Sequence, residues 1–72
     1  MVNINKLKGK IAENGLSIGQ LADKMGVNKS TLYRKFAGNG DTFSIAEADS
    51  IAKILSLDAN EAQGIFFSQI VA

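Results

Sequence analysis

Three short segments of the chain share a pattern that marks the start of a helix. Residues 17–20 read SIGQ, residues 44–47 read SIAE and residues 58–61 read DANE. In each segment the first side chain can accept a hydrogen bond from the backbone N–H three residues later, and the Gln or Glu at that later position can return the contact. The pattern predicts three helices with defined starts, and no proline interrupts the 72 residues.

The spacing of apolar residues predicts two more helices. One follows Asn3, a favourable capping residue, and stops at Gly15. The other starts from Asn28 and stops near Gly38. The five expected helices cover about residues 4–14, 17–25, 28–38, 45–56 and 59–69. We therefore expect one compact all-α domain that spans residues 1–72.

Composition excludes several classes of function. The chain has no Cys and no His, so it lacks the usual ligands of zinc sites and the usual general base of nucleophilic catalysis. A domain of this size also shows no orienting group or oxyanion site for a nucleophile. We expect no catalytic residue, no metal site, no cofactor and no small-molecule substrate. Apolar runs are short, which predicts no membrane association and a cytoplasmic protein.

The charges are unevenly distributed along the chain. Residues 1–40 hold seven Lys and Arg against two acidic residues, a net charge of +5, whereas residues 41–72 hold one Lys against five acidic residues, a net charge of −4. This asymmetry suggests one face that attracts polyanions, although it is also found in domains where charge only promotes solvation.

The third expected helix separates apolar from hydrogen-bonding side chains. At about 100° per residue, Leu32 and Phe36 share one side. The other side carries Ser30 and Arg34, and Tyr33 lies on the flank. Lys29 is angularly closer to the apolar side, but as the first helical residue its long side chain can reach forward past the helix end. These four side chains can donate hydrogen bonds, and none is a carboxylate. Arg and Lys can pair with guanine, Ser with several bases, and Tyr with phosphate or a thymine methyl group. A solvated helix face has the same composition, so this helix alone leaves both readings open.

The segment LADKMGVNKSTLYRKF, residues 21–36, resembles the helix-turn-helix of phage repressor and Cro-type regulators, the XRE-like family. An Ala in the first helix, a Gly in the turn and an aliphatic residue in the second helix recur in that family, and Ala22, Gly26 and Leu32 match them. The resemblance implies a lambda-repressor-like fold in which the second and third helices form the motif at about residues 17–37. The chain departs from many relatives at Ile18, where they place a Gln that grips a phosphate.

The resemblance also implies a function and a set of contacts. The chain would be a sequence-specific transcriptional regulator, a Cro-like repressor of a phage or prophage, that inserts the third helix into the major groove of an operator in double-stranded DNA. Base-reading roles fall on Lys29, Ser30, Tyr33 and Arg34. Phosphate contacts fall on Ser17, Gly19, Lys35, Asn39 and Gly40, with added charge from Lys6 and Lys10.

The apolar C-terminal segment is the expected site of self-association. A recognition helix covers one half-site and the next half-site lies ~34 Å away along the duplex, so we expect a homodimer at least on DNA. The candidate contact residues are Phe66, Phe67, Ile70 and Val71. The alternative is a protein-interaction module of the same fold that binds another regulator or a toxin through this segment. The sequence also leaves open whether the chain is the N-terminal part of a longer repressor.

Overall fold

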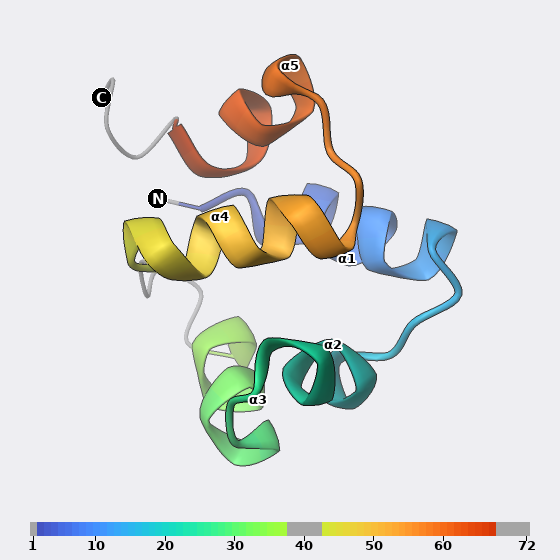
Figure 1. Cartoon of the computed structure of the whole chain (residues 1–72), viewed down its shortest axis with the longest axis vertical. Helices are drawn as coiled ribbons and strands as arrows, with labels where there is room; N and C mark the ends of the chain where they lie inside the picture. The colour runs from blue at the N-terminus through green and yellow to red at the C-terminus, as the bar shows by residue number, and fades with distance from the viewer. Residues whose placement is uncertain (1, 38–42, 68–72) are drawn as a thin grey trace.

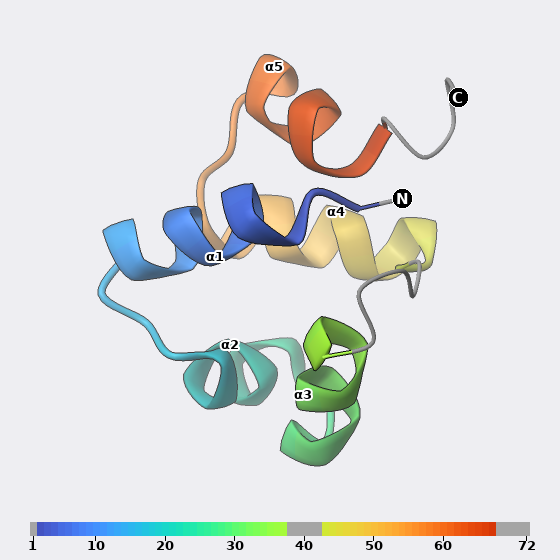
Figure 2. The same ribbon diagram turned by 180° about the vertical axis from the view of Figure 1, so that it is seen from behind.

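The computed structural model describes residues 2–37 and 43–67, and these residues form helices and no strands. The helices are α1 (Ile4–Glu13), α2 (Ile18–Met25), α3 (Lys29–Ala37), α4 (Ile45–Ile54) and α5 (Ala59–Ala62), followed by the π-helix η1 (Gln63–Phe67). Figure 1 shows α1 and α4 in the middle, α2 and α3 at the lower end, and α5 with η1 at the upper end. The view from behind agrees (Figure 2). The expected all-α five-helix domain is confirmed, and its extents are 29 × 23 × 20 Å.

The expected helix starts are present. At α2, Oγ of Ser17 accepts a hydrogen bond of 3.1 Å from the Gln20 backbone N–H, and the Ser17 N–H donates one of 2.8 Å to Oε1 of Gln20. The same reciprocal pairs join Ser44 to Glu47 and Asp58 to Glu61 at the starts of α4 and α5. The side chain of Asn3 accepts from the Lys6 N–H at the start of α1. These contacts satisfy backbone donors that a helix leaves unpaired at its start.

Three helices end in the same way. The chain adopts a positive φ at Gly15 (70°), Gly26 (74°) and Ser56 (55°), directly after the last turns of α1, α2 and α4. At each position the N–H donates to a carbonyl three residues back, and the next N–H donates to one five residues back. This is the Schellman closure, which favours glycine at the residue with positive φ. Ser56 adopts that conformation with a β-carbon, which costs conformational energy.

The last helix differs from the expectation of a continuous α-helix over residues 59–69. The α-helical hydrogen bonding ends at Ala62, and Gln63–Phe67 form the wider π-helical turn. Residues 68 and 69 lie outside the described residues. Ile65 and Phe66 are both buried on this turn, and the carbonyl of Ile65 accepts a hydrogen bond of 2.9 Å from the Asn3 N–H. The tertiary contact with the residues before α1 therefore accompanies the change in helix type.

The core contains apolar side chains from α1, α2, α3, α4 and η1, from the residues before α1 and α4, and from the end of α4. Its buried members are Val2, Ile4, Leu7, Ile11, Leu21, Ala22, Leu32, Phe36, Phe43, Ile51, Leu55, Ile65 and Phe66. Phe43 lies between two other rings: its centroid is 5.9 Å from that of Phe36 and 6.0 Å from that of Phe66, with edge-to-face angles of 75° and 83°. This geometry is a favourable one for aromatic pairs, and it connects α3 with η1 through the residue that precedes α4.

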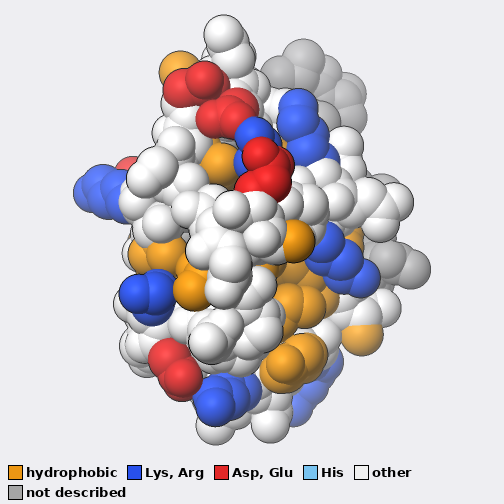
Figure 3. Space-filling model, turned by 90° about the vertical axis from the view of Figure 1, so that its right-hand side faces the viewer, with side chains coloured by type: hydrophobic (Ala, Val, Ile, Leu, Met, Phe, Trp, Pro, Cys, Tyr) orange, Lys and Arg blue, Asp and Glu red, His pale blue; other side chains and the backbone are white. Residues whose placement is uncertain are grey.

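The uneven charge along the chain is reflected on the surface. On the face drawn in Figure 3, acidic side chains gather towards the upper end, where α5 lies. Lys and Arg side chains are spread over this face, beside the acidic ones at the upper end and also at the lower end, where α2 and α3 lie and an acidic side chain is present as well. Among residues 2–37 and 43–67, ion pairs from Lys10 to Glu61 and from Lys35 to Glu47 join the two halves of the sequence. Part of the positive charge of residues 1–40 therefore serves contacts within the fold.

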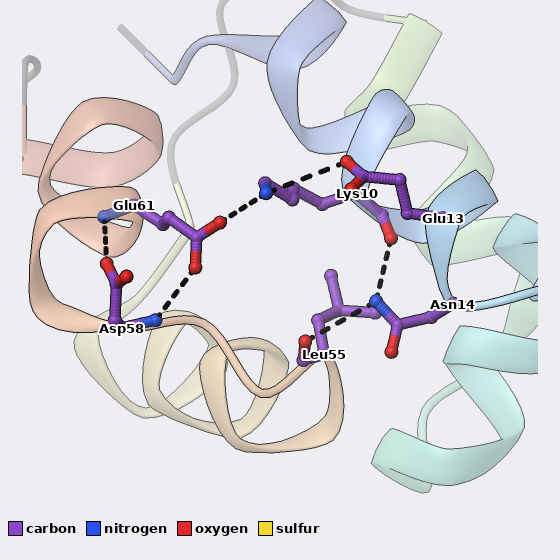
Figure 4. A network of polar contacts seen from close by, with 6 residues as sticks. All are labelled: Lys10, Glu13, Asn14, Leu55, Asp58 and Glu61. Atoms are coloured by element: carbon purple, nitrogen blue, oxygen red, sulfur yellow. Dashed lines mark hydrogen bonds and ion pairs between the residues drawn. The ribbon is translucent and has the colours of Figure 1, made fainter.

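A polar network at Lys10 joins α5 to α1 (Figure 4). The Lys10 ammonium group donates to the Glu61 carboxylate and lies 3.6 Å from Oε2 of Glu13. The hydrogen bond from Lys10, and then the one from the Asp58 backbone N–H, lower the pKa of Glu61. The same contact with Glu61 is the main cause that raises the pKa of Lys10. Both shifts favour the charged forms and so favour the contact between the two helices.

We expect Ser56→Gly to stabilise the fold. A non-glycine residue at this φ costs about 1–2 kcal/mol, and a glycine gives back roughly 0.5–1 kcal/mol through the larger entropy of the unfolded chain. The free energy of unfolding, measured by urea titration, should rise by about 0.5–1 kcal/mol. Ser56→Ala is the control and should bring no gain, because alanine keeps the β-carbon. An equal effect of the two substitutions would contradict the role of the backbone conformation.

We expect the Lys10–Glu61 contact to make stability depend on pH. The pKa of Glu61 is lower in the folded than in the unfolded chain, so its contribution is present above the unfolded pKa and is lost as pH falls through the folded pKa. The pKa of Lys10 is raised, so its contribution is lost only as alkaline pH passes the folded pKa. Glu61→Gln keeps an oxygen that can accept from the Asp58 N–H but removes the charge.

Urea unfolding between neutral pH and about pH 3 measures this effect. The free energy of unfolding of the wild-type chain should fall more steeply on acidification than that of Glu61→Gln. Parallel profiles for the two proteins would show that the ion pair contributes nothing.

Candidate nucleic-acid interface

The position of α3 follows from its start and from its apolar residues. The side chain of Asn28 accepts a hydrogen bond of 2.7 Å from the Ser30 N–H at the start of the helix. Leu32 and Phe36 are 1% and 3% exposed, so one side of α3 is fixed in the core. Because a helix has a fixed period, the other side must face solvent. α3 itself contains no acidic residue.

The structure exposes all four predicted base-reading residues, three of them on or beside this outer side and Lys29 at the start of the helix. Lys29, Ser30, Tyr33 and Arg34 are exposed, and the exposed fraction of Tyr33 is 50%. We call these four residues the α3 surface. Within the part of the chain that the structure describes, Arg34 has no ion-pair partner, so its guanidinium group is available to a ligand. Each of the four side chains can donate hydrogen bonds. Their expected exposure to solvent is confirmed.

The first turn of α2 lies beside the α3 surface. A β-carbon on Gly19 would lie 3.5 Å from Cδ of Lys29 and 3.5 Å from Oη of Tyr33. Gly19 itself is buried, because these two side chains cover it. The predicted phosphate contact through the Gly19 amide is therefore not open in this conformation. Ser17 is exposed; its Oγ accepts from the Gln20 N–H, and its hydroxyl hydrogen remains able to donate outward.

Asp23 of α2 is an acidic neighbour of the α3 surface that sequence reasoning did not single out. Its Oδ2 lies 3.7 Å from Nζ of Lys29, and the two side chains are 62% and 59% exposed. An ion pair this exposed contributes little stability. Asp23 and Lys29 are six residues apart and belong to different helices, so no local pattern in the sequence brings them together.

Lys35, predicted as a phosphate contact, is engaged within the fold. Its Nζ lies 3.6 Å from Oε1 of Glu47 and 5.5 Å from the centroid of the Phe43 ring. Its side chain is only 23% exposed. These contacts connect the end of α3 to the start of α4. Lys35 therefore has a structural role, and its charge is less available to a phosphate than the sequence suggested.

Lys6 and Lys10 lie away from the α3 surface, and their grouping with it is wrong. Lys10 pairs with Glu61, and Nζ of Lys6 lies 2.6 Å from the position of a β-carbon on Gly64. Both side chains therefore face α5 and η1, at the opposite end of the molecule from α3 (Figures 1 and 2). The sequence placed them near the motif because they precede it closely, but α1 directs them the other way.

The predicted dimer contact at Phe66 is also wrong. Phe66 is 1% exposed and packs against Phe43 in the core, so its ring is not available to a second copy. The side chain of Phe67 and the residues Ile70 and Val71 lie outside what the structure describes, as do Asn39 and Gly40. Ile45, at the start of α4, is the large aliphatic side chain with the greatest exposure among the described residues, at 84%.

Phe43 is a core residue that sequence reasoning did not single out. It directly precedes the capping residue Ser44, and Ala48 follows at the fourth helical position. An apolar residue before the cap often packs against the fourth residue of the helix, as in a hydrophobic staple. Leu16 and Val27 occupy the equivalent positions before α2 and α3, and both pack against the core. The same rule applied at Ser44 would have identified Phe43 as a core residue.

No group of three or more Asp and Glu side chains is placed to hold a metal ion in residues 2–37 and 43–67. Among the helices that the structure describes, none has the length and apolar character needed to cross a bilayer.

Known protein families, curated proteins and solved structures were compared with this chain, and none of them matches it. Any functional assignment thus depends on the residues and their geometry.

We expect Phe66→Ala to unfold the domain rather than to change its association. Removing a buried phenylalanine ring costs about 3–5 kcal/mol, which is comparable to the whole stability of a small domain. Tyr33→Ala is the matched control, since that ring is half exposed, and it should change the free energy of unfolding by no more than about 0.5 kcal/mol. Circular dichroism during urea unfolding measures both. A Phe66→Ala protein of wild-type stability would contradict the core assignment.

Proposed function

We propose that the chain is a sequence-specific DNA-binding transcriptional regulator of the Cro-like kind, which places α3 in the major groove of an operator. The observation that carries this proposal is the α3 surface: four exposed side chains that can donate hydrogen bonds, with no carboxylate on the helix, held by the buried Leu32 and Phe36. The acceptors that this surface fits are the base edges and phosphates of DNA.

The dimensions of α3 suit this role. An α-helix with its side chains is about 10–12 Å across. The major groove of B-DNA is about 12 Å wide and admits one α-helix. In the figures α3 lies at the lower end of the molecule, with α2 as its neighbour (Figures 1 and 2). The helix can therefore enter the groove before α4 or α5 meets the duplex.

The residues of the α3 surface take different roles. Arg34 can make two hydrogen bonds to one guanine, and Ser30 can pair with more than one base. Lys29 and Tyr33 cover the first turn of α2, so they are placed to reach both a base edge and the adjacent phosphate. Ser17, at the start of α2, is available for a phosphate contact on the same side. Asp23 repels phosphates, so its position beside Lys29 limits binding to unrelated DNA.

A single copy covers only one half-site. The longest extent of the molecule is 29 Å, whereas successive major grooves on one side of the duplex are ~34 Å apart. Two copies related by a two-fold axis would read an inverted repeat, and a homodimer on DNA forms part of this proposal. Bound over a promoter in the bacterial cytosol or nucleoid, such a dimer of a phage or prophage regulator would act as a repressor by occlusion.

The alternative of a protein-interaction module receives less support. It assigned the binding role to the apolar C-terminal segment, but Ile65 and Phe66 of that segment are core residues with 0% and 1% exposure. These two large apolar side chains are therefore not available to bind a partner through the C-terminal segment.

Selection of bound duplexes from a random-sequence pool tests the proposal. The selected duplex should contain an inverted repeat with half-site centres about 10 base pairs, or a multiple, apart. Binding should weaken steeply as salt rises, because each phosphate contact releases counterions. A pool that returns no preferred sequence would overturn the proposal.

We expect Arg34→Ala to lose affinity for the selected duplex. Loss of a bidentate guanine contact should cost about 1–3 kcal/mol on that duplex and much less on unrelated DNA. Lys53→Ala is the matched control, because it removes an exposed cation on α4, where Lys53 pairs with Asp49 at 3.0 Å. It should leave sequence preference unchanged. An equal loss for Arg34→Ala on all sequences would make Arg34 a phosphate contact instead.

A further inference from the structure

The corner where α1 ends contains an Asn followed by a Gly. Nδ2 of Asn14 donates a hydrogen bond of 2.9 Å to the Lys10 carbonyl and lies 3.4 Å from the Leu55 carbonyl (Figure 4). The first contact closes the end of α1, and the second connects it to the end of α4. Asn14 is also exposed to water. The Asn14 side-chain amide thus donates to one carbonyl of α1 and to one at the end of α4.

The bonding at this corner restrains a reaction that the Asn-Gly dipeptide favours. In such a dipeptide the peptide nitrogen of the glycine can attack the asparagine side chain, since glycine has no side chain to block the approach. Here the Gly15 N–H donates to the Ala12 carbonyl at 2.9 Å, and Gly15 has a φ of 70°. The Asn14 side chain points back along α1 to the Lys10 carbonyl. The attacking nitrogen is therefore hydrogen-bonded, and the side-chain amide that it would attack is held by other contacts.

We propose that Asn14 is a site of covalent modification by deamidation, with water as the co-reactant, and that the reaction occurs only when the end of α1 opens. Helix ends open locally at much lower free energy than the whole domain unfolds. Opening breaks the Gly15–Ala12 hydrogen bond and releases the Asn14 amide together. This inference concerns the fold and is independent of DNA binding.

The reaction balances without an oxidant or a reductant. The Gly15 peptide nitrogen gives up its proton to solvent and forms a bond to Cγ of Asn14. The bond between Cγ and Nδ2 breaks, and the nitrogen leaves as ammonia, which leaves a five-membered cyclic imide. Water then hydrolyses one of the two carbon–nitrogen bonds within the ring. The product is aspartate or isoaspartate at position 14, and the net change is the gain of one water and the loss of one ammonia.

The product cannot restore the original contacts. A carboxylate has no hydrogen to donate, so it would face the carbonyl oxygens of Lys10 and Leu55. It would also place a negative charge at the C-terminal end of α1, where the helix dipole is already negative. Isoaspartate lengthens the backbone by one bond at the Schellman closure. Modification therefore makes the opening of this corner permanent.

The full chain, incubated at neutral pH with and without guanidinium chloride, tests the proposal. Trypsin separates Asn14, in residues 11–24, from the other Asn-Gly pair, Asn39 and Gly40, in residues 36–53. Each conversion adds about 1 Da to its peptide. In denaturant the peptide 11–24 should convert, and in native buffer its conversion should be slower by at least about tenfold. Equal rates, or no conversion in denaturant, would overturn the proposal.

Two further measurements test the attack by the Gly15 nitrogen and the effect of conversion on stability. Gly15→Ala should slow conversion of peptide 11–24 in denaturant, because the added methyl group blocks the attack. Converted protein, isolated by its extra negative charge from an aged sample of the Asn39→Gln chain, in which Asn14 and Gly15 are the one Asn-Gly pair left, should melt roughly 5 °C or more below the unconverted protein of the same chain. Asn14→Asp should melt with the converted fraction, or fail to fold. An aged fraction that melts at the wild-type temperature would show that the Asn14 contacts do not hold the corner.

Discussion

The contact of Phe43 with Phe36 and Phe66 is the interaction on which the position of α3 depends. The three rings come from α3, from the segment before α4 and from η1, and they meet edge to face at 5.9 and 6.0 Å. Leu32 adds a second buried anchor on α3. A chain of this size can bury only about 60% of its unfolded surface, so few other contacts could replace these. The outward direction of the α3 surface is a consequence of this anchoring.

The helices could be predicted from the sequence because their signals are local. Each capping box spans four residues, and the glycines at positions 15 and 26 stop their helices through a property of their own backbone. The exposure of Arg34 followed from the helical period, whereas that of Lys29 followed from its long side chain at the first position of the helix. Ser56 shows the limit of this reasoning, because a serine at a position that favours glycine gives no sign of a helix end.

The positions of several side chains could not be predicted, because they depend on contacts between residues that are distant in the sequence. Phe66 was assigned to a dimer contact because pattern alone cannot say which of two neighbouring aromatic residues enters the core, and the partner that decides it is Phe43. Likewise Lys10 and Lys35 were counted as ligands for phosphate, although each pairs with a glutamate from the second half of the chain. A count of charges along the sequence therefore overstates the positive charge that is free of contacts within the fold, whereas Arg34 lies on the exposed side of α3.

The most direct test of the account is to map the surface that DNA contacts. Amide resonances of isotopically labelled protein should be followed by NMR as the selected duplex is added. We predict that the largest shifts fall on residues 29–34 of α3 and on the first turn of α2, with little change in α5 and η1. Shifts confined to α4, α5 and η1, with α3 unaffected, would contradict the claim that the α3 surface is the part of this protein that meets DNA.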